Sequence, residues 1–230
     1  MNAGIQVTTT SPAQSKMAAV SGMVGLLLLA LLGCAGAGVE SLDPGRYEGR
    51  TYVQDQFGLR ITFPEDWNIV ADAAAAERID AAGRQMLSAG DPTGDAYRSA
   101  GPSTSRNLFT VYRFPLGTVQ GLNPSLIAGV ENVMARPEIQ TPVDYLEMLK
   151  DFLTRGGTPI QFQPIAADTS LGGQSFAVLG ATIQAGQPPI GQVYFCRRLD
   201  PYMLTVVASF TTQAQWLELQ AVLDTMTLEK

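Results

Sequence analysis

The segment that decides the fold lies near the C-terminus and reads Tyr202-Met203-Leu204-Thr205-Val206-Val207-Ala208-Ser209-Phe210. Its even-numbered side chains from position 204 onward are apolar, whereas Thr205 and Ser209 are polar. This period of two is typical of a β-strand with one buried face. Residues 160–163 and 179–183 alternate in the same way, so we expect three strands of one sheet.

The connections between these strands are short and rich in turn residues. Gly172-Gly173, Gly186-Gln187-Pro188-Pro189 and Asp200-Pro201 interrupt the apolar stretches at close intervals. Parallel strands need long crossover connections, whereas antiparallel strands close through a few residues. The pattern therefore predicts an antiparallel sheet.

Further strands are expected in the N-terminal half of the chain. A short strand is predicted near 47–53, and residues 57–63 alternate between apolar and other side chains. Pro64-Glu65-Asp66-Trp67 then turns the chain into a returning strand, and we expect Trp67 to be buried under the last helix. The stretches 108–114 and 126–133 are rich in Val, Ile and aromatic residues, which favour strands.

Two helices carry clear start signals. Thr141 is a suitable N-cap and is followed by Pro142 at the first helical position, while Gly156-Gly157 provides a stop. The last helix is predicted to start at Thr212, where Gln215 completes a capping box. The order of elements is therefore strands, a helix, a long meander and a final helix.

The region between residues 72 and 106 has few large apolar side chains. The Ala content of residues 72–87 favours a helix. We expect residues 88–106 to form a long surface loop, which either contacts another molecule or has no contact role. Asp91 and Asp95 in this loop lack the denser carboxylate spacing of a calcium-binding loop.

The composition excludes several classes of function. The chain has 230 residues, of which 46% are hydrophobic and 16% charged, so it is expected to fold. Its net charge of −6 argues against a nucleic-acid partner. It contains no His, which removes imidazole metal ligands and every Ser-His or Cys-His nucleophile pair. We expect neither a metal nor a cofactor.

Residues 17–39 carry no charge and contain a Leu-rich run that ends in Leu31-Leu32-Gly33-Cys34. This ending resembles the bacterial lipobox, in which the Cys becomes the lipidated first residue of the mature protein. We therefore expect a signal peptide over 1–33, a fatty acid such as palmitate on Cys34 and a flexible tether over 34–46. The alternative is an uncleaved transmembrane span over 17–39.

Both alternatives attach a single domain, residues 47–230, to a membrane. Without Lys16 the mature chain keeps 14 Lys and Arg against 21 Asp and Glu, a net charge of −7, so anionic lipid should not attract it. The expected location is the bacterial cell envelope. In a bacterium with two membranes this is the outer membrane facing the periplasm, and otherwise it is the outer face of the plasma membrane.

Few residues are suited to catalysis. Cys196 lies in the apolar stretch 193–196, where a Cys is usually a small core residue with an inert thiol. The acid pairs Glu65-Asp66, on a turn, and Glu147 with Asp151, on the polar face of a helix, are typical of solvated surface. An enzyme that works without His is therefore the least favoured hypothesis.

A carrier of a small apolar ligand is a second alternative. Four aromatic side chains are candidates to line a cleft between sheet and helix, although their spacing also fits an ordinary core: Tyr145, Phe152, Tyr194 and Trp216. A deep apolar pocket would favour the carrier, whereas a filled core with exposed apolar side chains would favour an interaction domain.

Two motifs resemble the PsbP-like superfamily, which includes DcrB-like proteins and mycobacterial lipoproteins. The first is the strand that ends in Phe63-Pro64 followed by Trp67, and the second is the closing unit that begins at Leu171-Gly172-Gly173 and includes 202–209. The resemblance implies an α+β fold in which an antiparallel sheet of about six or seven strands is covered by helices, a PsbP-like α/β/α sandwich. It also implies a non-catalytic binding or assembly module. With the expected location in the envelope, we expect the partner to be an envelope protein, whose identity the sequence does not give.

Overall fold

The computed structural model describes residues 42–71, 105–155, 159–184 and 187–229. Its largest element is an eight-stranded antiparallel sheet in which seven strands follow the order β4-β5-β6-β11-β10-β9-β7, while β8 also pairs with β9. In this order the strands are β4 (Asn68–Ile69), β5 (Ser105–Tyr112), β6 (Ser125–Asn132), β11 (Tyr202–Phe210), β10 (Ile190–Leu199), β9 (Gln174–Ile183) and β7 (Ile160–Phe162), with β8 (Ala166–Leu171) beside β9.

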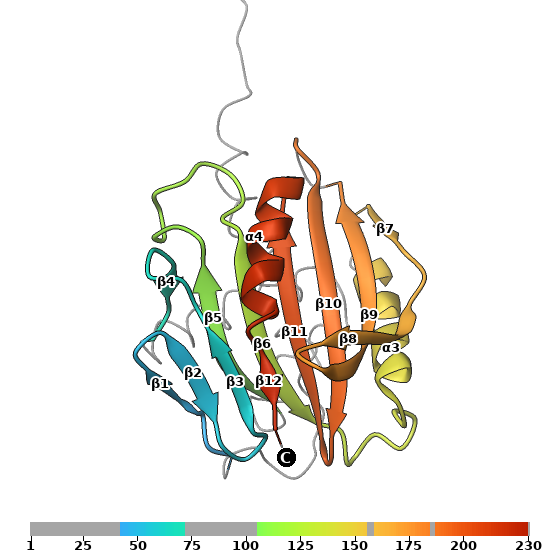
Figure 1. The fold of residues 1–230 in the computed structure, drawn as a ribbon. Helices are drawn as coiled ribbons and strands as arrows, with labels where there is room; N and C mark the ends of the chain where they lie inside the picture. Colours follow the sequence, from blue (N-terminus) through green and yellow to red (C-terminus); the bar gives the residue numbers. More distant parts are fainter. Residues whose placement is uncertain (1–41, 72–104, 156–158, 185–186, 230) are drawn as a thin grey trace, which may run out of the picture.

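A second, smaller sheet packs on one face of the first. It has the order β1-β2-β3-β12, with β1 (Arg46–Glu48), β2 (Thr51–Gln54), β3 (Leu59–Thr62) and β12 (Thr227–Leu228). β12 follows the last helix and pairs with β3 near the start of the domain, so the two ends of the described chain meet in this sheet (Figure 1).

Two helices lie on opposite faces of the large sheet. α3 (Pro142–Arg155) packs against β9 and β10, and α4 (Gln213–Leu223) packs against β11 and β3. In Figure 1 α4 crosses the front of the sheet beside the small sheet, whereas α3 lies behind β9. The predicted capping box is present, because Thr212 and Gln215 each accept a hydrogen bond from the other's backbone N–H.

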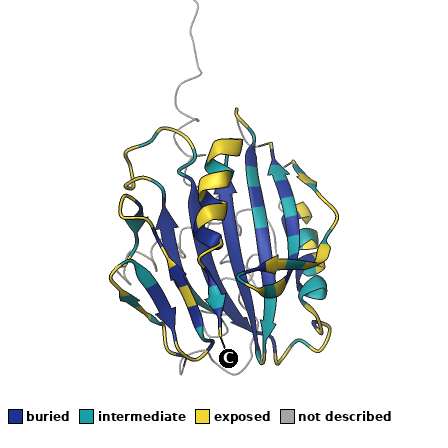
Figure 2. Ribbon diagram, viewed as in Figure 1, coloured by how far each residue is buried: buried dark blue, intermediate teal, exposed yellow. Residues whose placement is uncertain are grey.

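The alternation in β11 explains why both faces are buried. Leu204 and Val206 belong to the core under α4 and the small sheet, while Met203 and Val207 belong to the core under α3. Figure 2 shows the central strands as buried along their length, and the outer side of α4 as exposed. Burial of both sets of side chains is the main source of stability for such a layered fold.

The predicted α+β class, an antiparallel sheet covered by helices, is therefore confirmed. The large sheet has eight strands where about six or seven were expected, the second sheet was not expected, and two strands differ locally. The single strand expected near 47–53 is a hairpin of β1 and β2, because Gly49 takes a φ of 62° and turns the chain. The strand expected over 57–63 starts at Leu59, because the N–H of Phe57 donates to the carbonyl oxygen of Gln54 in a turn. The predicted segments 1–33 and 72–87, the glycine stop at 156–157 and most of the loop 88–106 lie outside the described residues.

Candidate functional site

A groove of about 470 Å³ opens between α4 and the turn that follows β3. The turn provides Phe63, Pro64 and Trp67, and the helix provides Ala221 and Val222. Thr62, Asp66, Arg113, Glu218 and Thr225 complete the lining. The walls are thus mainly apolar, with charged groups at the side where β5 ends.

The turn that begins at Phe63-Pro64 is held in place by hydrogen bonds to its backbone carbonyl oxygens. The N–H of Trp67 donates to the carbonyl oxygen of Pro64 at 3.2 Å, and the guanidinium of Arg50 donates to the carbonyl oxygen of Trp67 at 2.6 Å. The Trp67 side chain is 5% exposed and packs in the core that contains Leu219 and Val222 of α4. Its predicted burial next to the last helix is confirmed.

Arg113 joins the two walls of the groove. Its guanidinium lies 2.8 Å from a carboxylate oxygen of Asp66 on the turn and 2.8 Å from one of Glu218 on α4. It also lies 5.0 Å from the centre of the Phe114 ring, within cation–π range. This triad could not be predicted from the sequence, because Arg113 and Glu218 are 105 positions apart and only the fold brings them together.

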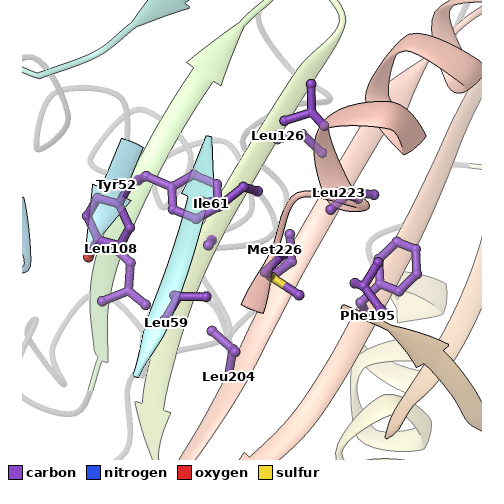
Figure 3. Close-up of a cluster of buried hydrophobic side chains, with 14 of the residues drawn as sticks. Tyr52, Leu59, Ile61, Leu108, Leu126, Phe195, Leu204, Leu223 and Met226 are labelled. Carbon is purple, nitrogen blue, oxygen red and sulfur yellow. The ribbon is translucent and has the colours of Figure 1, made fainter. Parts of the chain in front are cut away.

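A filled core lies under the small sheet and the end of α4. Figure 3 shows Leu223 and Met226, at the end of α4 and just after it, in the same cluster as Ile61 of β3 and Phe195 of β10. All four are buried. Phe63, Trp67 and Val222, which line the groove, are buried members of this same cluster.

Three exposed apolar side chains lie close in sequence to lining residues of the groove. Leu217 is 57% exposed and lies one helical turn before Ala221, so both occupy the same side of α4. Phe114, which follows Arg113, is 37% exposed, and Leu116 is 52% exposed. An apolar groove with exposed apolar residues next to it is typical of a contact surface for another molecule.

Cys196 is fully buried on the opposite face of the sheet, in the core under α3. Its Sγ lies 3.9 Å from Oγ1 of Thr205, and burial raises the pKa of the thiol far above its ordinary value. The core position expected for this residue is confirmed. An unionised thiol without access to solvent is a poor nucleophile.

Glu131 of β6 is a buried acid that contacts Tyr145 of this core. Its carboxylate accepts a 2.9 Å hydrogen bond from the hydroxyl of Tyr145 and lies 3.9 Å from Nε of Arg136. Burial raises the pKa of Glu131 to about 7, while the Arg136 charge and the Tyr145 hydrogen bond act in the opposite direction. The signal in the sequence that could have predicted this site is an acid inside the apolar stretch 126–133.

The other candidate acids lie apart. Glu65 and Asp66 are exposed on the turn, and Glu147 and Asp151 are exposed on α3, where Glu147 pairs with Lys150 at 3.1 Å. Within the described ranges, no three His, Cys, Asp or Glu side chains are grouped so that they could hold a metal ion. Cys34 lies outside the described residues.

The four aromatic residues proposed for a carrier do not share one cleft. Tyr145 and Tyr194 are buried in the core under α3, and Phe152 packs against the same core. Trp216 lies on the other face, where its ring centre is 5.2 Å from that of Phe210. The hypothesis of a common cleft is therefore wrong for Trp216, because α3 and α4 cover opposite faces of the sheet.

Three solved structures are similar to this chain at low sequence identity. LpqN of Mycobacterium tuberculosis, described as involved in cell envelope biogenesis, is 15% identical with a TM-score of 0.40, over 80% of this chain and 86% of LpqN. CyanoP, the PsbP of Synechocystis sp. PCC 6803, is 13% identical with a TM-score of 0.44, over 86% of this chain and 99% of CyanoP.

The third is PA94 of Pseudomonas aeruginosa, a protein of unknown function described as a putative regulator. It is 14% identical with a TM-score of 0.32, over 51% of this chain and 73% of PA94. These values describe similarity of chain path between distant proteins, and the envelope role belongs to LpqN. No family model matches the chain, and no curated protein sequence does.

In the part of the chain that the structure describes, neither helix has the length and apolar character needed to cross a membrane. Residues 17–39 and Cys34, for which membrane attachment is predicted, lie outside the described ranges.

Proposed function

We propose that this protein is a lipid-anchored, non-catalytic binding module of the bacterial cell envelope, and that the groove beside α4 is its contact surface. Its partner is an envelope protein that inserts an apolar segment between α4 and the Phe63–Trp67 turn. The protein is anchored through Cys34.

The groove is the observation that carries this proposal. Ala221 of the lining and Leu217, one helical turn before it, are exposed apolar residues on α4. The buried lining residues Phe63, Trp67 and Val222 belong to the packed core. Arg113 pairs with both acids of the lining, so these acids present less negative charge to an apolar ligand. Among the described residues, the thiol of Cys196 is buried and the acid pairs described above lie on separate exposed surfaces, which supports a role without catalysis.

Site-specific photocrosslinking in cells tests the proposal. A photoreactive phenylalanine analogue at Leu217 should give a discrete crosslinked product, whereas the same analogue at Asp151, exposed on α3, should not. Ala221→Trp should fill the groove and abolish the product, and Gln220→Trp, also exposed on α4 but outside the lining, should preserve it. Equal products at positions 217 and 151, or no effect of Ala221→Trp, would contradict the proposal.

A further inference from the structure

A second pocket, of about 270 Å³, lies on the same face of the large sheet but at the other end of the small sheet. Gln56 and Phe57 border it from the β2–β3 turn and Leu228 from β12. The opposite wall contains Gln174 of β9 and the end of β10, with Arg197, Leu199 and Asp200.

Arg197 is a partly buried cation without an acidic partner among the described residues. Its guanidinium donates to two neutral acceptors, the carbonyl oxygen of Ser175 at 2.7 Å and Oε1 of Gln174 at 2.9 Å. Its Nε atom is buried and has no hydrogen-bond partner within the described ranges. The guanidinium lies 5.9 Å from the centre of the Phe176 ring, which does not neutralise a full charge.

Asp200, the one acid in the lining, forms an ion pair with an arginine that does not line the pocket. It accepts a 2.6 Å hydrogen bond from Nε of Arg198, whose guanidinium also donates to the carbonyl oxygen of Ile139. Side chains alternate across a strand, so Arg197 and Arg198 leave β10 on opposite faces. Arg197 is thus the cation that a ligand in this pocket would meet.

We infer that this pocket binds a small organic carboxylate with an apolar body. A guanidinium matches the planar geometry of a carboxylate, and the amide nitrogens of Gln56 and Gln174 can add hydrogen bonds. Phe57, Leu199 and Leu228 provide the surface for the apolar body. The negative charge of Asp200 nearby favours a singly charged anion over a phosphate. The volume is below the roughly 300 to 1,000 Å³ usual for drug-sized ligands, so the ligand is small.

Ligand-observed fluorine NMR with 4-fluorobenzoate tests this inference on the full chain in a nonionic detergent, with a detergent-only blank. The benzoate should bind, and 4-fluorobenzyl alcohol, which has a similar ring without the charge, should bind at least about tenfold more weakly. Arg197→Gln should lower the affinity for the benzoate by a similar factor. Arg60→Gln, at an exposed arginine 3.6 Å from Glu48, should leave it unchanged.

A second pair of variants tests the charge of the pocket without altering Arg197. Gln56 is exposed on a turn, so Gln56→Glu and Gln56→Lys should both fold. The first should weaken benzoate binding and the second should strengthen it. Equal affinities in both variants, equal binding of the alcohol, or displacement of the benzoate by equimolar inorganic phosphate would overturn the inference.

Discussion

The hydroxyl of Tyr145 on α3 donates a 2.9 Å hydrogen bond to Oε2 of Glu131 on β6, and both side chains are buried. This contact joins the helix to the centre of the large sheet through a titratable group. Because burial raises the pKa of Glu131 from 4.5 to about 7, the native protein binds a proton in a pH range where the unfolded chain does not.

We expect the free energy of unfolding to fall as the pH rises from about 4.5 to 7, and this contribution to be constant above that range. In this window the native state binds more protons than the unfolded state, so ionisation of Glu131 opposes folding. The shift corresponds to roughly 3 kcal/mol over the whole window. Urea unfolding at several pH values measures it.

Glu131→Gln should flatten this dependence, because the amide can still accept the hydrogen bond from Tyr145 but does not titrate. Glu147→Gln, on the exposed side of α3, should retain the wild-type slope. If the slope between pH 4.5 and 7 is the same in all three proteins, Glu131 does not have the raised pKa.

Gly172→Ala should destabilise the protein more than Gly173→Ala. Both glycines have positive φ, of 57° and 74°, so each substitution strains the backbone. A Cβ at Gly172 would also collide with the carbonyl oxygen of Met226, whereas a Cβ at Gly173 would meet nothing within 4 Å. We expect a difference of at least about 1 kcal/mol in the free energy of unfolding. Equal losses would show that the β8–β9 turn and the segment after α4 do not touch.

Trp67→Ala should cost about 3 to 5 kcal/mol, since the buried indole would leave a cavity between the turn and α4. Thermal unfolding and urea titration measure the loss. Leu217→Ala, which removes an exposed side chain from α4, is the control and should cost little. An unchanged thermal midpoint for Trp67→Ala would refute the structural role of the ring.

The elements that could be predicted from the sequence are those whose structure depends on residues close together in the chain. The alternation in 202–210 and the capping box of Thr212 and Gln215 depend on neighbouring residues, and both appear in the structure. The split into two sheets could not be predicted, because β12 has only two residues and its partner β3 lies near the other end of the domain.

The candidate sites depend on the same long-range contacts. The groove needs Arg113 to meet Asp66 and Glu218, and the pocket at Arg197 needs the β2–β3 turn beside the end of β10. The charges and residue types along the chain do not predict either of these contacts. Cys196 was predictable, because its apolar neighbours in the strand already indicated a core position.

Cys196 should react slowly with a maleimide in the native protein, because its thiol is fully buried and its pKa is raised. Labelling should become fast in urea, and a cysteine introduced at the exposed Ser170 should label fast without urea. Mass spectrometry of the tryptic peptides follows each site. Fast native labelling of Cys196 would bring back the hypothesis of a nucleophilic or redox-active thiol.

Cys34→Ser should abolish lipid attachment. If Cys34 is the lipidated residue, processing of the signal should stall at the substituted site, and a longer precursor should remain in the membrane through its Leu26–Leu32 run. Metabolic labelling with a radioactive fatty acid should disappear in this variant. Cys196→Ser, which changes the other cysteine of the chain, is the matched control and should keep both processing and label.

An uncleaved transmembrane span predicts a different result for the wild-type protein. Residues 1–33 would then remain in the membrane fraction, and no fatty acid would be incorporated. The N-terminal sequence and intact mass of the membrane-bound protein distinguish the two, because lipidation leaves Cys34 as the first residue with an added acyl mass. Retention of residues 1–33 without a fatty acid would replace the lipoprotein by a single-pass anchor that carries the same domain.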